Sequence, residues 1–183
     1  MIINQSTWKI LSFFFDNPYL EVHLRELSRI TKVSTFSTKI SVDYLLSLNL
    51  LKERKVGKMR YVRANSSNLF FKYLKISFSI KKIMDSGLME YLLQNVPGIF
   101  CIVLFGSVAR GEDDKNSDLD LLVIGHRTNK LEFSKFESKI GRKIRPIILK
   151  WTEWKKESEK NKAFYLEVIT QGIPLYGDLP VVR

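Results

Sequence analysis

The sequence predicts an α+β chain of two small domains, an N-terminal helical domain that ends in a strand hairpin and a C-terminal α/β domain with a mixed sheet. In residues 1–65, apolar side chains at helical spacing are followed by two extended segments, whereas residues 88–183 alternate apolar strands with polar connections. A chain of 183 residues has room for both domains. Residues 66–87 are then expected to form a bridging helix.

Composition narrows the class of partner. Lys and Arg number 30 against 19 Asp and Glu, and the resulting net charge of +11 attracts polyanions such as nucleic acid, nucleotides or an anionic membrane surface. Cys101 is the single cysteine, which excludes a disulfide framework and a cysteine-based metal site. The N-terminus lacks the pattern of a signal peptide, and the apolar runs are too short to span a bilayer. These features predict a cytoplasmic protein without a membrane partner.

The N-terminal half has the pattern of three helices and a hairpin. Apolar spacing predicts helices over residues 6–15, 22–30 and 34–48. An extended segment then runs to residue 56, residues 57–58 form a turn, and residues 60–64 alternate basic and apolar side chains like a returning strand. The last two helices are joined by a tight turn.

The C-terminal half has a different pattern, with helices followed by alternating strands and polar segments. Residues 66–95 predict two helices, with Ser66 as a cap and an interruption at 85–87. Strands are expected at 99–105, 119–124 and 143–149. Thr152 is expected to cap a helix over 153–171 that Gly172 closes, before a last strand over 173–176.

Residues 5–65 resemble the winged-helix transcription regulators of bacteria and archaea. The resemblance implies that the second helix of the pair enters the major groove of double-stranded DNA and that the hairpin, or wing, touches the backbone or minor groove. Short polar or basic side chains on that helix are the expected DNA contacts: Ser34, Thr35, Ser37, Thr38 and Lys39.

The wing is strongly basic. Residues 52–63 hold six Lys or Arg residues against the single acid Glu53, and Lys55, Lys58 and Arg60 are expected to contact phosphates. A homodimer is a reasonable expectation, because such regulators commonly read paired half-sites. The alternative is a charged hairpin on a protein–protein adaptor, since winged helices also serve that purpose.

A second constellation lies between two apolar strands. The segment 104–111 reads Leu-Phe-Gly-Ser-Val-Ala-Arg-Gly, and the segment 117–123 reads Ser-Asp-Leu-Asp-Leu-Leu-Val. Together they resemble the minimal nucleotidyltransferases of the DNA polymerase beta superfamily, over residues 88 to 178. The ordered spacing of these motifs is more specific than a lone glycine-rich loop.

The chemistry of these residues favours a nucleotide site. Asp118 and Asp120 are two apart at the start of a strand, so both carboxylates face one side and can share Mg²⁺ or Mn²⁺ as catalytic metal ligands. At the Gly106-Ser107 turn, free backbone N–H groups can bind a triphosphate, such as that of ATP, and glycine allows close approach. Arg110 adds a charge-assisted contact, and Ser117 is expected mainly to orient the loop. The alternative for the two acids is a capped loop before a buried strand.

The chain departs from the family pattern at one position. The resemblance implies a third carboxylate on a later strand, and Arg145 stands where that acid would align. A cation there opposes metal binding and favours phosphate. Glu153, or an acid of the 112–114 loop, could substitute, although no spacing requires it.

Two function classes follow. The first is a nucleotidyltransferase that uses a Mg²⁺-nucleoside triphosphate and carries a DNA-binding domain, with a protein hydroxyl as one acceptor that the resemblance implies. The second is a DNA-binding regulator whose nucleotidyltransferase-like domain has lost catalysis and acts as a nucleotide sensor or assembly module. Arg145 is the residue that favours the second class.

Overall fold

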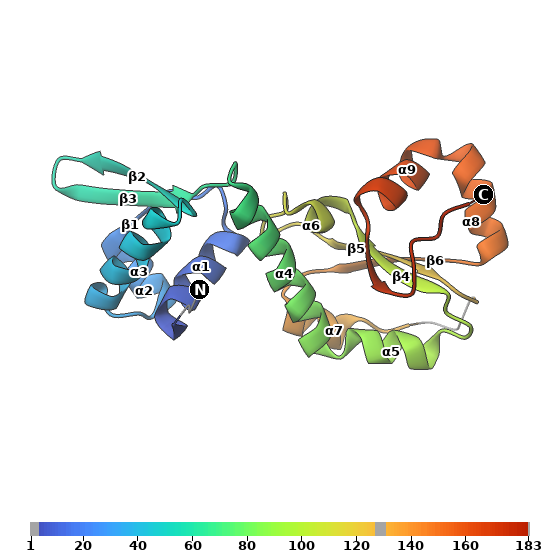
Figure 1. Ribbon diagram of the computed structural model, residues 1–183. Helices are drawn as coiled ribbons and strands as arrows, with labels where there is room; N and C mark the ends of the chain where they lie inside the picture. Colours follow the sequence, from blue (N-terminus) through green and yellow to red (C-terminus); the bar gives the residue numbers. More distant parts are fainter. Residues whose placement is uncertain (1–3, 127–130, 183) are drawn as a thin grey trace. The chain divides into compact units, whose positions relative to one another are not determined.

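The structure, a computed structural model, describes residues 4–126 and 131–182. It divides into two compact units, Met1–Lys75 (unit 1) and Ile76–Arg183 (unit 2). The division falls within helix α4 (Leu69–Ser86), which is drawn in green in Figure 1. None of the helices in the described residues has the length and apolar character needed to cross a bilayer.

Unit 1 combines helices with a small sheet. Its elements run in the order α1 (Gln5–Asp16), β1 (Val22–His23), α2 (Leu24–Thr31), α3 (Thr35–Ser47), β2 (Leu51–Val56) and β3 (Met59–Ala64). Within the described residues, the strands form an antiparallel sheet in the order β1-β3-β2. Side chains cap α1 and α3, since Asn4 accepts a hydrogen bond from the backbone N–H of Thr7 and Ser34 accepts one from that of Ser37.

The core of unit 1 follows the helical spacing of the sequence. Apolar residues three and four apart lie on the inner faces of α1 and α3, and side chains from β2 and β3 complete the core. Its fully or nearly fully buried members include Ile10, Leu11, Phe14, Phe15, Leu27, Val42, Leu45, Leu51 and Val62.

One boundary in unit 1 differs from the expectation. The helix predicted from residue 22 begins at Leu24, because Val22 and His23 pair with β3 instead. The Nδ1 atom of His23 accepts a hydrogen bond from the backbone N–H of Arg25 at 3.2 Å. His23 is therefore a helix cap.

Unit 2 is built on a second sheet. After α4, its elements are α5 (Leu88–Asn95), β4 (Cys101–Phe105), α6 (Gly106–Arg110), β5 (Leu119–Ile124), α7 (Ser134–Ile140), β6 (Ile144–Leu149), α8 (Trp151–Lys160), α9 (Lys162–Gln171) and β7 (Ile173–Tyr176). Within the described residues, the strand order is β6-β5-β4-β7, with β5 and β6 parallel and the other pairs antiparallel. The expected mixed sheet is confirmed.

The sheet of unit 2 buries both faces. Figure 1 shows α5 and α7 on one side of it and α8 and α9 on the other. Because side chains alternate along a strand, Ile102 and Leu104 of β4 enter the first core, whereas Val103 and Phe105 enter the second. Leu122 and Ile124 of β5 also enter the second core, so Asp120 is aimed at the face that α8 and α9 cover.

Several C-terminal expectations need correction. The helix predicted over 153–171 is two helices, because Asn161 leaves helical geometry and its side chain accepts a hydrogen bond from the backbone N–H of Phe164. The first of them begins at Trp151, so Thr152 lies inside the helix. The capping contact is made instead by Glu153, which accepts from the backbone N–H of Lys150 at 2.9 Å.

Two further differences concern shorter features. The helix after residue 65 is capped by Asn68 rather than Ser66, since the Asn68 side chain accepts a hydrogen bond from the backbone N–H of Phe71 at 3.0 Å. The sequence does not predict helix α7, because its seven residues are too few to show a clear helical pattern.

Candidate active site

A tight turn follows strand β4 and leads into α6. Gly106 has φ of +74°, a left-handed conformation that favours glycine. A Cβ atom at this position would overlap the Oδ2 atom of Asp120. From the sequence, this glycine is expected to admit a phosphate. In the structure the space is filled by the Asp120 carboxylate, so the missing side chain lets the turn close on this acid.

Asp120 is the centre of the site. It pairs in register with Phe105 of β4 on one side and with Arg145 of β6 on the other. Burial raises the pKa of its carboxyl group above the ordinary value, and the negative charges of Asp118 and Glu167 add to this rise, whereas Arg145 and Arg110 oppose it. Asp120 is therefore a partly desolvated carboxylate that gains from a nearby cation.

Asp118 is held by the cation that replaces the expected third acid. The Nη2 atom of Arg145 lies 2.7 Å from the Oδ2 atom of Asp118. The Arg145 side chain is 70% exposed, and an exposed ion pair of this kind contributes little to stability. Asp118 can therefore exchange Arg145 for another cation at low energetic cost.

Arg110 links α6 to α9. Its Nε atom donates to Glu112 at 2.9 Å, and its Nη1 atom donates to Glu167 of α9. The sequence predicts Arg110 on a polyphosphate, whereas in the structure two carboxylates hold the guanidinium at the edge of the site. The sequence does not identify Glu167 as a site residue, because it lies 57 residues away from Arg110 and belongs to no motif.

The loop between α6 and β5 is anchored by Arg142, which the sequence analysis also missed. Arg142 is buried and forms an ion pair of 2.6 Å with the buried Asp113. Its other nitrogen donates to the backbone carbonyls of Asp114 and Ser117. Arg142 thus fixes the residue that directly precedes Asp118.

Ser117 is bonded within the loop that it is expected to orient. Its Oγ atom accepts a hydrogen bond from the backbone N–H of Asp114 at 3.0 Å. The Asp114 carboxylate in turn accepts from the backbone N–H of Asn116 at 2.8 Å, which lowers the pKa of Asp114. These contacts make a rigid turn before β5.

Among the described residues, the acids suggested as substitutes for the third carboxylate are bonded elsewhere. Asp113 is engaged with Arg142, Glu112 with Arg110, and Glu153 with the start of α8. In the part of the chain that the structure describes, no group of three His, Cys, Asp or Glu side chains is arranged to hold a metal ion. The two aspartates nevertheless fit a Mg²⁺ ion that takes its other ligands from substrate phosphates and water, as this ion usually does.

The residues of unit 1 that are expected to contact DNA differ in their exposure to solvent. Thr35, Lys39, Lys55 and Lys58 are exposed. Thr38 is fully buried and its hydroxyl faces the carbonyl of Val33, so the expectation that it contacts DNA is wrong. The error arises because α3 packs the side that carries Thr38 against the core, and helical spacing of short polar residues does not reveal which side that is.

Three other expected contacts already have partners. Arg60 lies between Asp43, at 2.6 Å, and Glu53, so its charge is balanced within unit 1. Ser34 and Ser37 bond to each other at the start of α3. The accessible positive charge of the wing therefore rests less on Arg60 than on Lys58 and on Lys55, whose Nζ atom stays 3.9 Å from the Glu53 carboxylate.

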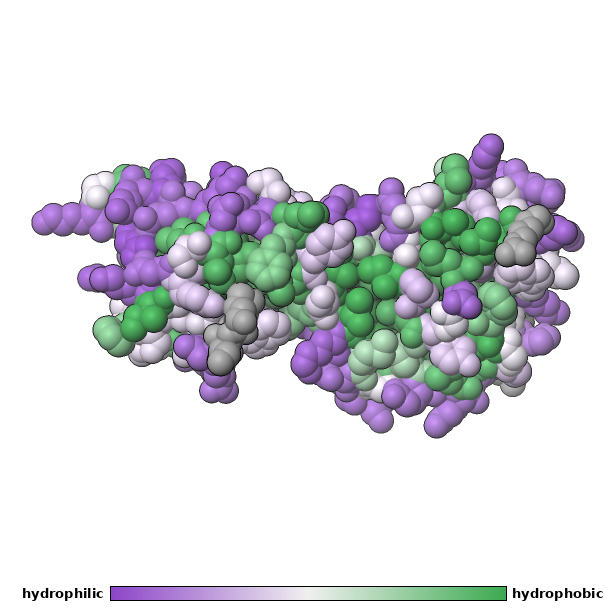
Figure 2. Space-filling view, viewed as in Figure 1, coloured by the Kyte–Doolittle hydropathy of each residue, from purple (hydrophilic) through white to green (hydrophobic). Residues whose placement is uncertain are grey.

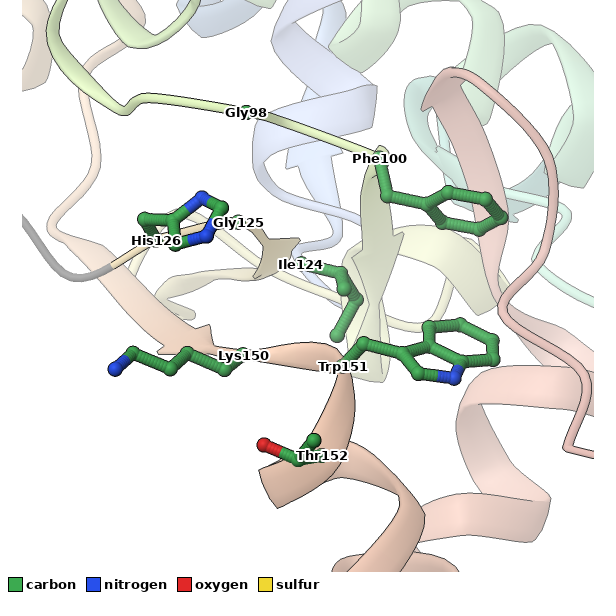
Figure 3. A pocket seen from close by; sticks show the side chains of 8 residues that line it. All are labelled: Gly98, Phe100, Ile124, Gly125, His126, Lys150, Trp151 and Thr152. Carbon is green, nitrogen blue, oxygen red and sulfur yellow. The ribbon is translucent and has the colours of Figure 1, made fainter.

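A separate shallow pocket lies at the far end of β5 from Asp120. It has a volume of about 230 Å³, and Ile124, the last residue of β5, lines it. Figure 3 shows His126 and Lys150 on one side and the rings of Phe100 and Trp151, whose centroids are 5.1 Å apart, on the other. None of the described residues that line it is acidic, so this pocket is not the aspartate site.

Part of this chain is similar to known proteins. A comparison with curated proteins gives no match. A solved toxin–antitoxin structure with AMP-PNP is 24% identical, covering 50% of this chain and 71% of its own, with a TM-score of 0.38. A mutant toxin–antitoxin structure, MntA-HpeT, is 22% identical with the same coverage and a TM-score of 0.37. Residues 85–171, which hold the Gly106 turn, both aspartates and Arg145, match the family model of the nucleotidyltransferase domain.

Proposed function

We propose that unit 2 transfers a nucleoside monophosphate from a nucleoside triphosphate, with ATP as the first candidate, to a hydroxyl group. The observation that carries this proposal is the closure of the Gly106 turn on the Asp120 carboxylate, beside Asp118 and inside the segment that matches the nucleotidyltransferase domain. In such a transfer, the hydroxyl group loses its proton to water and its oxygen bonds to the α-phosphorus. The bond between the α-phosphorus and the oxygen that bridges it to the β-phosphate breaks, and pyrophosphate leaves.

Asp118 and Asp120 are the residues that would hold Mg²⁺ or Mn²⁺. When bound, the ion supplies positive charge to the phosphate oxygens of the transition state. The raised pKa of Asp120 reflects a carboxylate that is poorly compensated within the protein, and the exposed Arg145 can leave Asp118 for a phosphate. Arg145 and Arg110 then flank the bound triphosphate as cations.

The test is incubation of the full chain with labelled nucleoside triphosphates, Mg²⁺ or Mn²⁺ and cell extract. We expect a labelled macromolecular product that requires the divalent ion and that carries the α-phosphate label but no γ-phosphate label. Failure to label any acceptor with any of the common nucleotides would overturn the transfer proposal. A protein hydroxyl is the acceptor class that we propose to examine first.

We further propose that unit 1 is a winged helix-turn-helix domain that binds double-stranded DNA. The order of one helix, a short strand, two further helices and a terminal hairpin supports this proposal. Hydrophilic side chains, shown in purple, cover the hairpin of β2 and β3 in Figure 2. Exposed cations gather on α2, on α3 and on this hairpin: Arg25, Arg29, Lys32, Lys39, Lys55 and Lys58.

Removing two of the exposed wing lysines is expected to weaken DNA binding. A Lys55→Ala, Lys58→Ala variant should lower duplex affinity and reduce the slope of log affinity against log salt by about 2, because each lost phosphate contact releases one counterion fewer. Arg60 is left intact, since it joins the wing to Asp43. A gel-shift series over salt concentration measures the slope.

The matched control for the wing is a variant with two exposed lysines of α8 replaced, Lys155→Ala, Lys156→Ala. This variant has the same net charge as the wing variant. An equal loss of affinity in both variants would show that binding follows net charge alone, and it would remove the wing from the proposed interface.

The ion pair between Arg145 and Asp118 favours a second candidate, a regulator whose unit 2 senses a nucleotide without reacting. In that case the wild type yields no labelled product, yet ATP raises its melting temperature, and Arg145→Ala reduces this shift through loss of a cation. Arg145→Asp restores an acid at the third position. Metal-dependent transfer by Arg145→Asp alone would show that the wild type is a lapsed enzyme, whereas transfer by the wild type would exclude the sensor.

A further inference from the structure

Helix α3 presents two large apolar side chains on its exposed face. Phe36 is 74% exposed and Ile40, one turn later, is 50% exposed. Thr38, Val42 and Leu45 form the opposite, buried face. Two large apolar groups in solvent, flanked by the exposed Lys39, are not needed for the core of unit 1.

The same face of α3 adjoins the basic hairpin. Asp43 follows Phe36 by seven residues, which is two helical turns, and bonds to Arg60 of β3 at 2.6 Å. Arg60 lies opposite Lys55 in the hairpin register. The exposed face of α3 is therefore continuous with the wing, and the negative charge that Asp43 brings to this face is balanced by Arg60.

Charge decides which partner this apolar face suits. Cations are exposed on α2, on α3 and on the wing, the elements that carry or adjoin this apolar face, although Glu26 of α2 is also exposed. Figure 2 shows green, apolar surface beside α2 and α3 and purple surface over the hairpin. A polyanion with apolar groups at its centre matches this arrangement, and the major groove of DNA offers such groups only as the 5-methyl groups of pyrimidines.

We propose that Phe36 and Ile40 contact 5-methyl groups of thymine in the major groove and so set the base preference of unit 1. The inference rests on the proposed DNA binding of this unit and adds the feature of DNA that it reads. Polar base edges would lose water against Phe36 and Ile40 without gaining a hydrogen bond, whereas a methyl group loses only apolar contact with water. Lys39, next to Phe36 on the helix surface, holds phosphates irrespective of sequence.

The experiment uses the full chain and duplexes of mixed sequence that differ only in the methyl group. One duplex is prepared with thymine or with uracil, and a second with cytosine or with 5-methylcytosine. Each contacted methyl group is expected to raise affinity about four-fold. The thymine duplex should therefore bind more tightly than the uracil duplex, and the 5-methylcytosine duplex more tightly than the cytosine duplex.

Variants separate the methyl contact from general DNA binding. Phe36→Ala should reduce the methyl preference, and the double variant Phe36→Ala/Ile40→Ala should abolish it. Both variants should keep the melting temperature, because the two side chains are exposed. Lys39→Ala should weaken binding to every duplex equally. Leu69→Ala, which removes another exposed apolar side chain of unit 1, should keep the preference.

The outcomes distinguish the two levels of the proposal. Salt-dependent binding with equal affinity for methylated and unmethylated duplexes would overturn the methyl contact and leave the DNA-binding proposal intact. A methyl preference that persists in the double variant Phe36→Ala/Ile40→Ala would also overturn the methyl contact. Absence of binding to any duplex would overturn the proposed DNA binding together with this inference.

Discussion

Asp120→Asn is expected to lower the rate of nucleotidyl transfer by about 100-fold or more. The substitution removes one of the two carboxylates proposed to hold the divalent ion, and such an ion supplies several kcal/mol of transition-state stabilisation, or roughly a factor of ten for each 1.4 kcal/mol. The measurement is the initial rate of label transfer at saturating Mg²⁺ and ATP. Asp85→Asn, which changes an exposed acid of α4 outside the site, should transfer at the wild-type rate.

The stability of the same variant separates a lost site from a lost fold. Folding raises the pKa of Asp120, so the ionised carboxylate favours the unfolded chain once the pH exceeds its ordinary value. At neutral pH, the uncharged amide of the Asp120→Asn variant should therefore leave the melting temperature unchanged or raise it. Full activity in Asp120→Asn would contradict the metal assignment, and a lower melting temperature would contradict the burial argument.

Arg142→Ala is expected to destabilise unit 2 by about 3 kcal/mol or more, because it removes the cation that pairs with the buried Asp113. The loop that carries Ser117 also loses two hydrogen bonds to its backbone, so transfer activity should fall with stability. Urea denaturation measures the change in the free energy of unfolding.

Two control variants test whether burial causes the effect of Arg142→Ala. Lys81→Ala breaks an exposed ion pair of α4 and should cost no more than about 0.5 kcal/mol. Arg142→Lys keeps the charge but loses the forked geometry, so its loss of stability should be intermediate. A change below about 1 kcal/mol in Arg142→Ala would show that the buried pair does not support the loop.

Arg145 lies beside both aspartates of the proposed metal site. Pairing between β5 and β6 sets Arg145 opposite Asp120, and its guanidinium reaches Asp118. An acid at this position would add a third carboxylate to the metal site that we propose, whereas Arg145 neutralises part of the negative charge of the two aspartates. The transfer assay therefore measures whether two carboxylates and the substrate phosphates are sufficient.

Local patterns were enough to predict most elements and the central motif. The strands 119–124 and 173–176 have the predicted bounds, because runs of apolar and β-branched residues between turn signals depend on neighbours in sequence. The Gly106 turn and the aspartate pair could be predicted for the same reason, because each is defined by residues that are close together in the sequence. The strand predicted over 143–149 was also found, as β6, so the position of Arg145 on this strand could be predicted from the sequence.

Tertiary structure alone decided which side chains meet across long stretches of sequence. Arg142 reaches Asp113 over 29 residues and Arg110 reaches Glu167 over 57, and no local pattern encodes either contact. Packing likewise buried Thr38, paired Arg60 with Asp43, and placed the Asp120 carboxylate against Gly106. The periodicity of a sequence indicates on which side of its own helix or strand a side chain lies. The partner of a charged side chain depends in addition on which separate elements pack together and exclude water.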